Sequence, residues 1–316
     1  MSDRAYDALE ISRIIGQPVD PRKPYPTIVN EVCDIDTADP DEYVYAYDVL
    51  QDTEKIHVLT SSGAVTQEVV SPDTPTLISF VDVASQEYYV KLVDLAKAKE
   101  RVLARKKATI NRAMNAWEEY KVIELLASAT TSTGNENTLR SGYTKFVWPD
   151  LIDMLDQIQD YGDSYVLIQG TNLAKDMVNW NWDNNKYHDL TEAFNRLNIS
   201  TVRMPTTMNF YLQDDDTSGS TLTATDVLSS NVGYLVARST EVGKPGLFVR
   251  KNLNAMESIG GIISMDGDAP QRLVFVSPNP ITVTSTARYL AVGLTGFEEI
   301  ATFLKNEKAV SKFTRT

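Results

Sequence analysis

The chain is 316 residues long, is 42% hydrophobic and carries a formal net charge of −13 at pH 7. A chain of this size can bury a sizeable core, and its length predicts two or three subdomains. The acidic balance argues against a dedicated nucleic-acid-binding protein, whose electrostatic footprint would be basic. The sequence contains no long apolar run and no basic leader before an apolar stretch. It therefore indicates neither a membrane span nor a secretory signal. Cys33 is the only cysteine, which excludes an internal disulfide framework.

Residues 1–41 are expected to form an extended N-terminal arm. Pro18, Pro21, Pro24 and Pro26 are too closely spaced for a regular helix or a central strand. A terminal arm of this kind either stays mobile or is ordered by another subunit.

Residues 42–72 are expected to form a projecting β-hairpin loop. Tyr43, Tyr45 and Tyr47 alternate along one strand, and two further runs, 55–60 and 64–70, have strand character. A hairpin of this size buries little by itself, so it is expected to pack elsewhere. Residues 77–83 are expected to be a mostly apolar strand. The hairpin is acidic, and its carboxylates are Asp48, Asp52, Glu54 and Glu68.

Residues 86–127 are predicted to form one long amphipathic helix. Apolar residues recur at steps of three and four, which indicates a helical period. They are Tyr88, Leu92, Leu95, Val102, Leu103, Ile110, Ala113, Met114 and Trp117. The opposite arc is basic and carries Lys97, Arg101, Arg105 and Arg112. A helix of this length spans some 60 Å at roughly 1.5 Å per residue, so it must pack against the rest of this chain or neighbouring chains.

Residues 128–141 are polar and are expected to form an exposed linker, after which the pattern becomes α/β. Helices are expected from Pro149 and over 170–180 and 190–197. Strands are expected over 165–168, 200–204 and 232–237, so that helices pack against a sheet.

The polar segment 213–225 contains Asp214, Asp215 and Asp216. These carboxylates could bind a cation, but their spacing lacks a calcium-loop pattern, so solvated side chains are the preferred interpretation.

Residues 243–316 have strand character again. Strands are expected over 247–249, 272–276, 281–284 and 289–292, and a short closing helix over 297–305. The natural partners of these strands are the strand at 77–83 and the apolar face of the long helix.

Catalytic motifs are scarce. His57 and His188 are the only histidines, which makes a histidine metal site improbable, and no cofactor motif is present. Gly162-Asp163-Ser164 resembles the nucleophile block of the GDS-type esterases, with His188 as a notional base. Because the residue expected to be aspartate near that histidine is Asn185, a helix-to-strand turn is the preferred interpretation.

The order of parts resembles the tailed-phage major capsid proteins, whose subunits have the Hong Kong 97-type shell fold. The resemblance covers nearly the whole chain and rests on its layout, with local similarity over 105–127 and 288–304. It implies an α+β fold whose parts follow one another along the chain. These are an N-terminal arm (1–41), an extended β-hairpin loop (42–72), a peripheral domain (73–142) with a spine helix (86–127), an α/β axial domain (143–242), and return strands with the C-terminal segment (243–316).

The resemblance also implies a structural function and no enzyme activity. Copies of the chain would assemble into pentamers and hexamers of an icosahedral shell enclosing double-stranded DNA, with portal and possible scaffolding or cement proteins as partners. Assembly would occur in the host cytoplasm, and the protein would reside in the virion. Encapsulin-type nanocompartment shells share the fold and are the alternative; a GDS-type esterase is the remote one.

Two charge contacts follow from this layout. The acidic hairpin would pair with the basic arc of the long helix on the next copy, or with Arg250 and Lys251. Alternatively, the basic arc would face the enclosed DNA. Copies of Asp214, Asp215 and Asp216 would lie around a capsomer axis and attract cations or basic residues such as Arg203.

Overall fold

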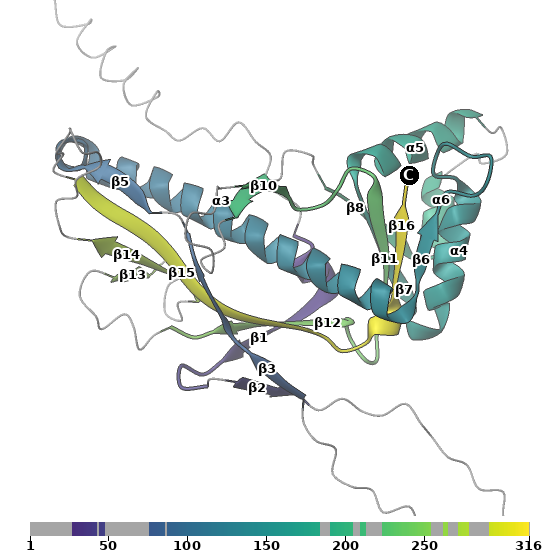
Figure 1. Cartoon of the computed structure of the whole chain (residues 1–316), viewed down its shortest axis with the longest axis horizontal. Helices are drawn as coiled ribbons and strands as arrows, with labels where there is room; N and C mark the ends of the chain where they lie inside the picture. The colour runs from purple at the N-terminus through teal and green to yellow at the C-terminus, as the bar shows by residue number, and fades with distance from the viewer. Residues whose placement is uncertain are drawn as a thin grey trace, which may run out of the picture.

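The computed structural model describes residues 27–42, 44–47, 76–85, 87–183, 190–204, 209–212, 223–253, 262–264, 271–277 and 291–315. A single helix, α3 (Leu92–Thr133), crosses the molecule. A β-sheet lies below most of its length, and a second sheet with helices on its outer face lies at its C-terminal end (Figure 1). The predicted mixture of helices and strands is therefore present, arranged around one long helix.

The long helix begins and ends six residues later than the sequence predicted. Tyr88 belongs to a strand, β5 (Tyr88–Lys91), because pairing with β15 overrides the helical period there. At the other end, Thr130 and Thr133 donate their hydroxyl hydrogens to carbonyls of the preceding turn, and Gly134, at φ 75°, follows the last residue of the helix. The first residues of the expected linker are thus helical.

The larger sheet has seven strands. They are β1 (Cys33–Ala38), β4 (Val81–Ala84), β5, β12 (Gly246–Lys251), β13 (Ile262–Ser264), β14 (Leu273–Ser277) and β15 (Ala291–Leu304). The strand β15 pairs with β14 and β12 along one edge and with β5 and β4 along the other. The prediction of a closing helix at 297–305 is wrong, because hydrogen-bonded strands on both sides of β15 hold that segment extended.

The second sheet has the strand order β6-β16-β11-β7-β8. Its strands are β6 (Glu136–Thr138), β7 (Ser164–Gln169), β8 (Ile199–Arg203), β11 (Val232–Arg238) and β16 (Val310–Thr314). The helices α4 (Trp148–Ile158), α5 (Thr171–Asp183) and α6 (Leu190–Arg196) flank it (Figure 1). The α/β pattern predicted from Pro149 to 237 is confirmed, but the chain's last strand and β6 also join this sheet.

Two apolar clusters cover the faces of this second sheet. Val166 and Ile168 of β7 pack in one cluster with Leu126 of α3. Leu167, between them, points to the other face and packs with Leu155 of α4. The strict alternation along β7 places α3 on one side of the second sheet and the shorter helices on the other. The same cluster includes Phe248 of β12 and Ile300 of β15, so the long helix packs against both sheets.

Several segments near the N-terminus differ from the expectation. Residues 27–38 lie in the folded body as α2 (Val29–Val32) and β1, which pairs in parallel with β12. The expected strand 77–83 is broken at Phe80 into β3 (Thr76–Ser79) and β4, and β3 pairs with β2 (Val44–Tyr47).

A separate two-stranded sheet follows the second sheet's β8, in which β9 (Asn209–Leu212) pairs with β10 (Thr223–Asp226).

The expected strands at 55–60, 64–70 and 281–284 lie outside the described residues. Among the helices of the described part, none combines the length and apolar character that a bilayer span requires.

Candidate interaction surface

A buried ionic network joins α3 to the larger sheet. The carboxylate of Glu118 on α3 accepts hydrogen bonds of 3.0 Å from Nε and Nη2 of Arg250, on β12. Arg272, beside β14, lies 2.9 Å from the same carboxylate and also pairs with Glu298 of β15. Burial raises the pKa of Glu298, and the Arg272 guanidinium opposes that shift. Removing one member of a buried ion pair leaves the other charge buried and unpaired, which strongly lowers the stability of the fold.

Arg250 and Lys251 therefore have partners within the chain. Lys251 Nζ lies 2.7 Å from the Glu299 carboxylate, and both side chains are buried. The sequence offered these two cations as contacts for an acidic hairpin of another copy. The structure instead pairs Arg250 with Glu118 of α3 and Lys251 with Glu299 of β15, within the same chain.

A second buried carboxylate, that of Glu119, holds α2 against the long helix. Its Oε2 accepts backbone hydrogen bonds from Ile28 at 2.7 Å and Val29 at 3.2 Å, which are amides at the start of α2. Burial raises the pKa of Glu119 to about 8, the neighbouring Glu118 adds to the shift, and the two amides and Arg250 oppose it. The connection between α3 and the chain that follows residue 26 thus includes a titratable group.

The sequence contained one signal for this network, which is a glutamate in the apolar row of α3. Ile110, Met114 and Val122 are buried on one face of α3, and the helical spacing places Glu118 in the same row. A carboxylate in an apolar row requires a buried cation from elsewhere, because an unpaired buried charge is costly. The partner strands follow far along the sequence, so the periodicity alone could not identify them.

The predicted basic arc of α3 is described only in part. Arg105 is exposed and Arg112 is half-buried, whereas the side chains of Lys97 and Arg101 lie outside the described residues. The acidic side chains of the hairpin, Asp48, Asp52, Glu54 and Glu68, lie outside them as well, as do Asp214, Asp215 and Asp216. The charge contacts between copies stay predictions.

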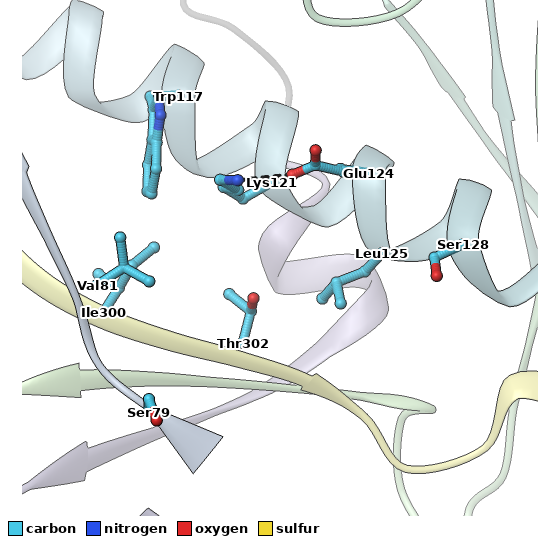
Figure 2. Close-up of a pocket in the computed structure, with 9 residues that line it drawn as sticks. All are labelled: Ser79, Val81, Trp117, Lys121, Glu124, Leu125, Ser128, Ile300 and Thr302. Carbon is cyan, nitrogen blue, oxygen red and sulfur yellow. Dashed lines mark hydrogen bonds and ion pairs between the residues drawn. The ribbon is translucent and has the colours of Figure 1, made fainter. Parts of the chain in front are cut away.

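A groove of about 310 Å³ runs between α3 and the sheet (Figure 2). The Trp117 ring extends from α3 towards Val81 of β4 and Ile300 of β15, and Lys121 pairs with Glu124 at 2.6 Å on the helix side. Val81 is 50% exposed, and Leu77 on the neighbouring β3 is 67% exposed. Apolar side chains are thus uncovered on β3 and β4, a distribution typical of a contact surface.

The esterase-like fragment forms a turn between a helix and a strand. The 3-10 helix η1 (Gln159–Tyr161) ends before Gly162, and β7 begins at Ser164, as the preferred interpretation predicted. Ser164 Oγ donates a weak 3.4 Å hydrogen bond to the carbonyl of Arg238, while Asp163 pairs with Thr240. His188 lies outside the described residues. Within the described part of the chain, no cluster of three or more metal-ligating side chains is present.

The chain has the fold of phage capsid structures. A structure from Mycobacterium phage Adephagia is 12% identical and superposes with a TM-score of 0.59, covering 93% of this chain and 91% of that chain. The capsid structure of the Cyanophage P-SCSP1u is 10% identical, with a TM-score of 0.52 and coverage of 94% and 90%. No protein-family model and no curated protein sequence matches the chain. At these identities the likeness establishes the fold, which confirms the predicted α+β capsid fold class.

Proposed function

We propose that the chain is the major capsid protein of a tailed phage and that it assembles into pentamers and hexamers of an icosahedral shell enclosing double-stranded DNA. The observation that carries the proposal is the fold that this chain shares with the structures from Mycobacterium phage Adephagia and the Cyanophage P-SCSP1u capsid. In each comparison the shared fold covers about nine-tenths of both chains. Its function is structural, without enzyme activity, and it resides in the virion after assembly in the host cytoplasm. Portal and scaffolding or cement proteins are its partners.

In this proposal, each part of a capsid subunit corresponds to elements of this chain. The helix α3 is the spine helix of a peripheral domain that contains the larger sheet, and the sheet flanked by α4, α5 and α6 is the axial domain. We assign residues 42–72 to the extended loop and residues 1–26 to the N-terminal arm. The chain enters the axial domain after α3, leaves it after β11 and returns in β16, which supports this division.

Expression of the full chain, followed by negative-stain microscopy and light scattering, tests the proposal. We expect closed particles of uniform size, and particles recovered from infected cells should protect double-stranded DNA from nuclease. Particles filled with a protein cargo would favour the encapsulin-type alternative. A chain that remains monomeric, alone and beside its phage partners, would contradict the proposal.

The acidic hairpin is expected to hold its neighbour partly by charge. Reversing Asp52 and Glu54 to lysine should reduce shell yield, because the partner arc on α3 of the next copy is basic. Each exposed pair contributes only about 0.2 to 1 kcal/mol, but the contact recurs at every subunit boundary. Sedimentation of assembled shells measures the effect, with Glu241→Lys, on an exposed turn, as the matched control.

Charge reversal on the arc identifies the partner. An Arg105→Glu or Arg112→Glu change should restore part of the yield lost by the hairpin variant. Failure of every arc reversal, Lys97 and Arg101 included, to restore assembly would exclude charge pairing. If the same reversals lower DNA retention in finished shells, the arc faces the DNA.

A further inference from the structure

A second groove lies beside the sheet that α4, α5 and α6 flank. It has a volume of about 490 Å³ and runs along β8 between α5 and α6. Met177, Phe194 and Ile199 supply an apolar floor, while Val178 beside it is 72% exposed. A groove with an apolar floor and an exposed rim is suited to a polypeptide segment.

The groove contains a buried acceptor that lacks a donor. Gln169, the last residue of β7, lines the groove and is only 7% exposed. Within the described ranges its Oε1 has no hydrogen-bond partner. Leaving a buried acceptor unpaired is unfavourable, and nearly all such groups in native proteins are paired. An N–H donor arriving from outside would remove that cost.

The backbone of β8 also has an unused edge. Tyr165 N–H donates to the Asn198 carbonyl and Met204 N–H to the Gln169 carbonyl, so the even-numbered residues of β8 face β7. The peptide groups of Ile199, Thr201 and Arg203 therefore point away from the sheet. In the described part of the chain β8 is the terminal strand, and no strand pairs with this edge. An extended segment could add to it as a further strand.

The charge of the groove indicates which segment fits. Arg203 is the only ionisable residue lining it, is exposed, and has no ion pair among the residues that the structure describes. The densest acidic run in the chain, Asp214-Asp215-Asp216, lies in the ten-residue segment 213–222. The antiparallel pair Leu212 and Thr223 holds the two ends of that segment side by side. Half of such a segment reaches about 16 Å at about 3.3 Å per residue.

We propose that the groove along β8 binds the acidic segment 213–222 of a neighbouring copy, with Arg203 facing the aspartates and Gln169 Oε1 receiving a backbone N–H. The proposal rests on the proposed shell function, because it requires copies arranged in a ring. One patch gripping a different patch on the next copy is a heterologous contact, which closes rings when the rotation closes. The contact would set the spacing of axial domains around each capsomer.

Two charge reversals test the contact. Arg203→Glu alone, and Asp214, Asp215 and Asp216 all changed to lysine, should each lower shell yield roughly tenfold, because a ring repeats the loss at every boundary. Both changes in one chain should restore assembly. Arg196→Glu on α6, an exposed residue near the groove, is the matched control and should assemble as the wild type does. Normal yield from both single variants, or no recovery in the combined variant, would overturn the proposal.

Mixing the two single variants separates contacts between copies from contacts within one copy. In an alternating hexamer every groove with the Arg203→Glu change meets a lysine segment, and every unchanged groove meets an aspartate segment, so hexamers should recover on co-expression. Pentamers cannot alternate and should not recover fully. Recovery in the combined chain without recovery on mixing would show that the segment folds onto its own groove, which overturns docking between copies. Failure of the wild type to assemble would instead contradict the shell function.

Gln169→Leu provides a test that does not depend on charge. Removing an unpaired buried acceptor should leave the unassembled subunit at least as stable as the wild type. Shell yield should nevertheless fall, because the arriving N–H loses its acceptor. An unchanged yield would contradict the part assigned to Gln169.

Discussion

Replacing Arg272 with methionine is expected to lower the free energy of unfolding of the unassembled subunit by about 3–5 kcal/mol. The change leaves the Glu298 carboxylate, which is 1% exposed, without its cation and takes one of two guanidinium partners from Glu118. Urea unfolding followed by circular dichroism measures the loss. Arg196→Met, which removes an exposed ion pair with Glu192, is the matched control and should change stability by no more than about 0.5 kcal/mol.

A second substitution separates the missing charge from the missing side chain. Combining Arg272→Met with Glu298→Leu should recover most of the lost stability, because an apolar pair of similar size avoids burying an unpaired carboxylate. The thermodynamic cycle should show a coupling of at least about 1 kcal/mol. A single Arg272→Met variant as stable as the wild type, or a double variant no better than the single, would mean that this network does not hold α3 to the sheet.

The parts that could be predicted from the sequence are those with a local period or a local stop. Helix α4 was recognised because Pro149 stands at its start, and α3 because its apolar steps continue for many turns. The pattern failed at β15, where a short closing helix was predicted over 297–305 and the carboxylates of Glu298 and Glu299 are buried in a strand. Their burial depends on Arg272 and Lys251, which lie elsewhere in the sheet, so only the tertiary structure shows it.

For the contact surfaces too, local patterns could be predicted, whereas contacts between distant segments could not. Charge runs such as Asp214-Asp215-Asp216 are visible in the sequence, and they predicted an acidic segment. The groove along β8 was not predicted, because it forms only where Gln169, Phe194 and Thr201 meet from three separate elements. A glutamine at the end of an apolar strand was the available signal, since such a buried amide needs partners.

The stability of the subunit is expected to fall as the pH rises from about 5 to about 8, and Glu119 is expected to supply much of that change. Burial raises the pKa of Glu119 to about 8 from an ordinary value of 4.5. Between these two values the folded state keeps a proton that the unfolded chain has released, so raising the pH favours unfolding. A shift of this size corresponds to a loss on the order of 4 kcal/mol by pH 8, and the loss levels off above that pH.

Glu119→Gln tests this assignment, because its amide oxygen can still accept the hydrogen bonds from Ile28 and Val29 but does not titrate. The variant should match the wild type near pH 5 and exceed its stability by pH 8. Other buried carboxyls, including Glu298, also have raised pKa values, so the informative quantity is the difference between the two proteins at each pH. The amides at the start of α2 favour the charged carboxylate, whereas burial and Glu118 favour the neutral acid. A difference that stays constant from pH 5 to 8 would show that the amides prevail and that Glu119 is charged throughout.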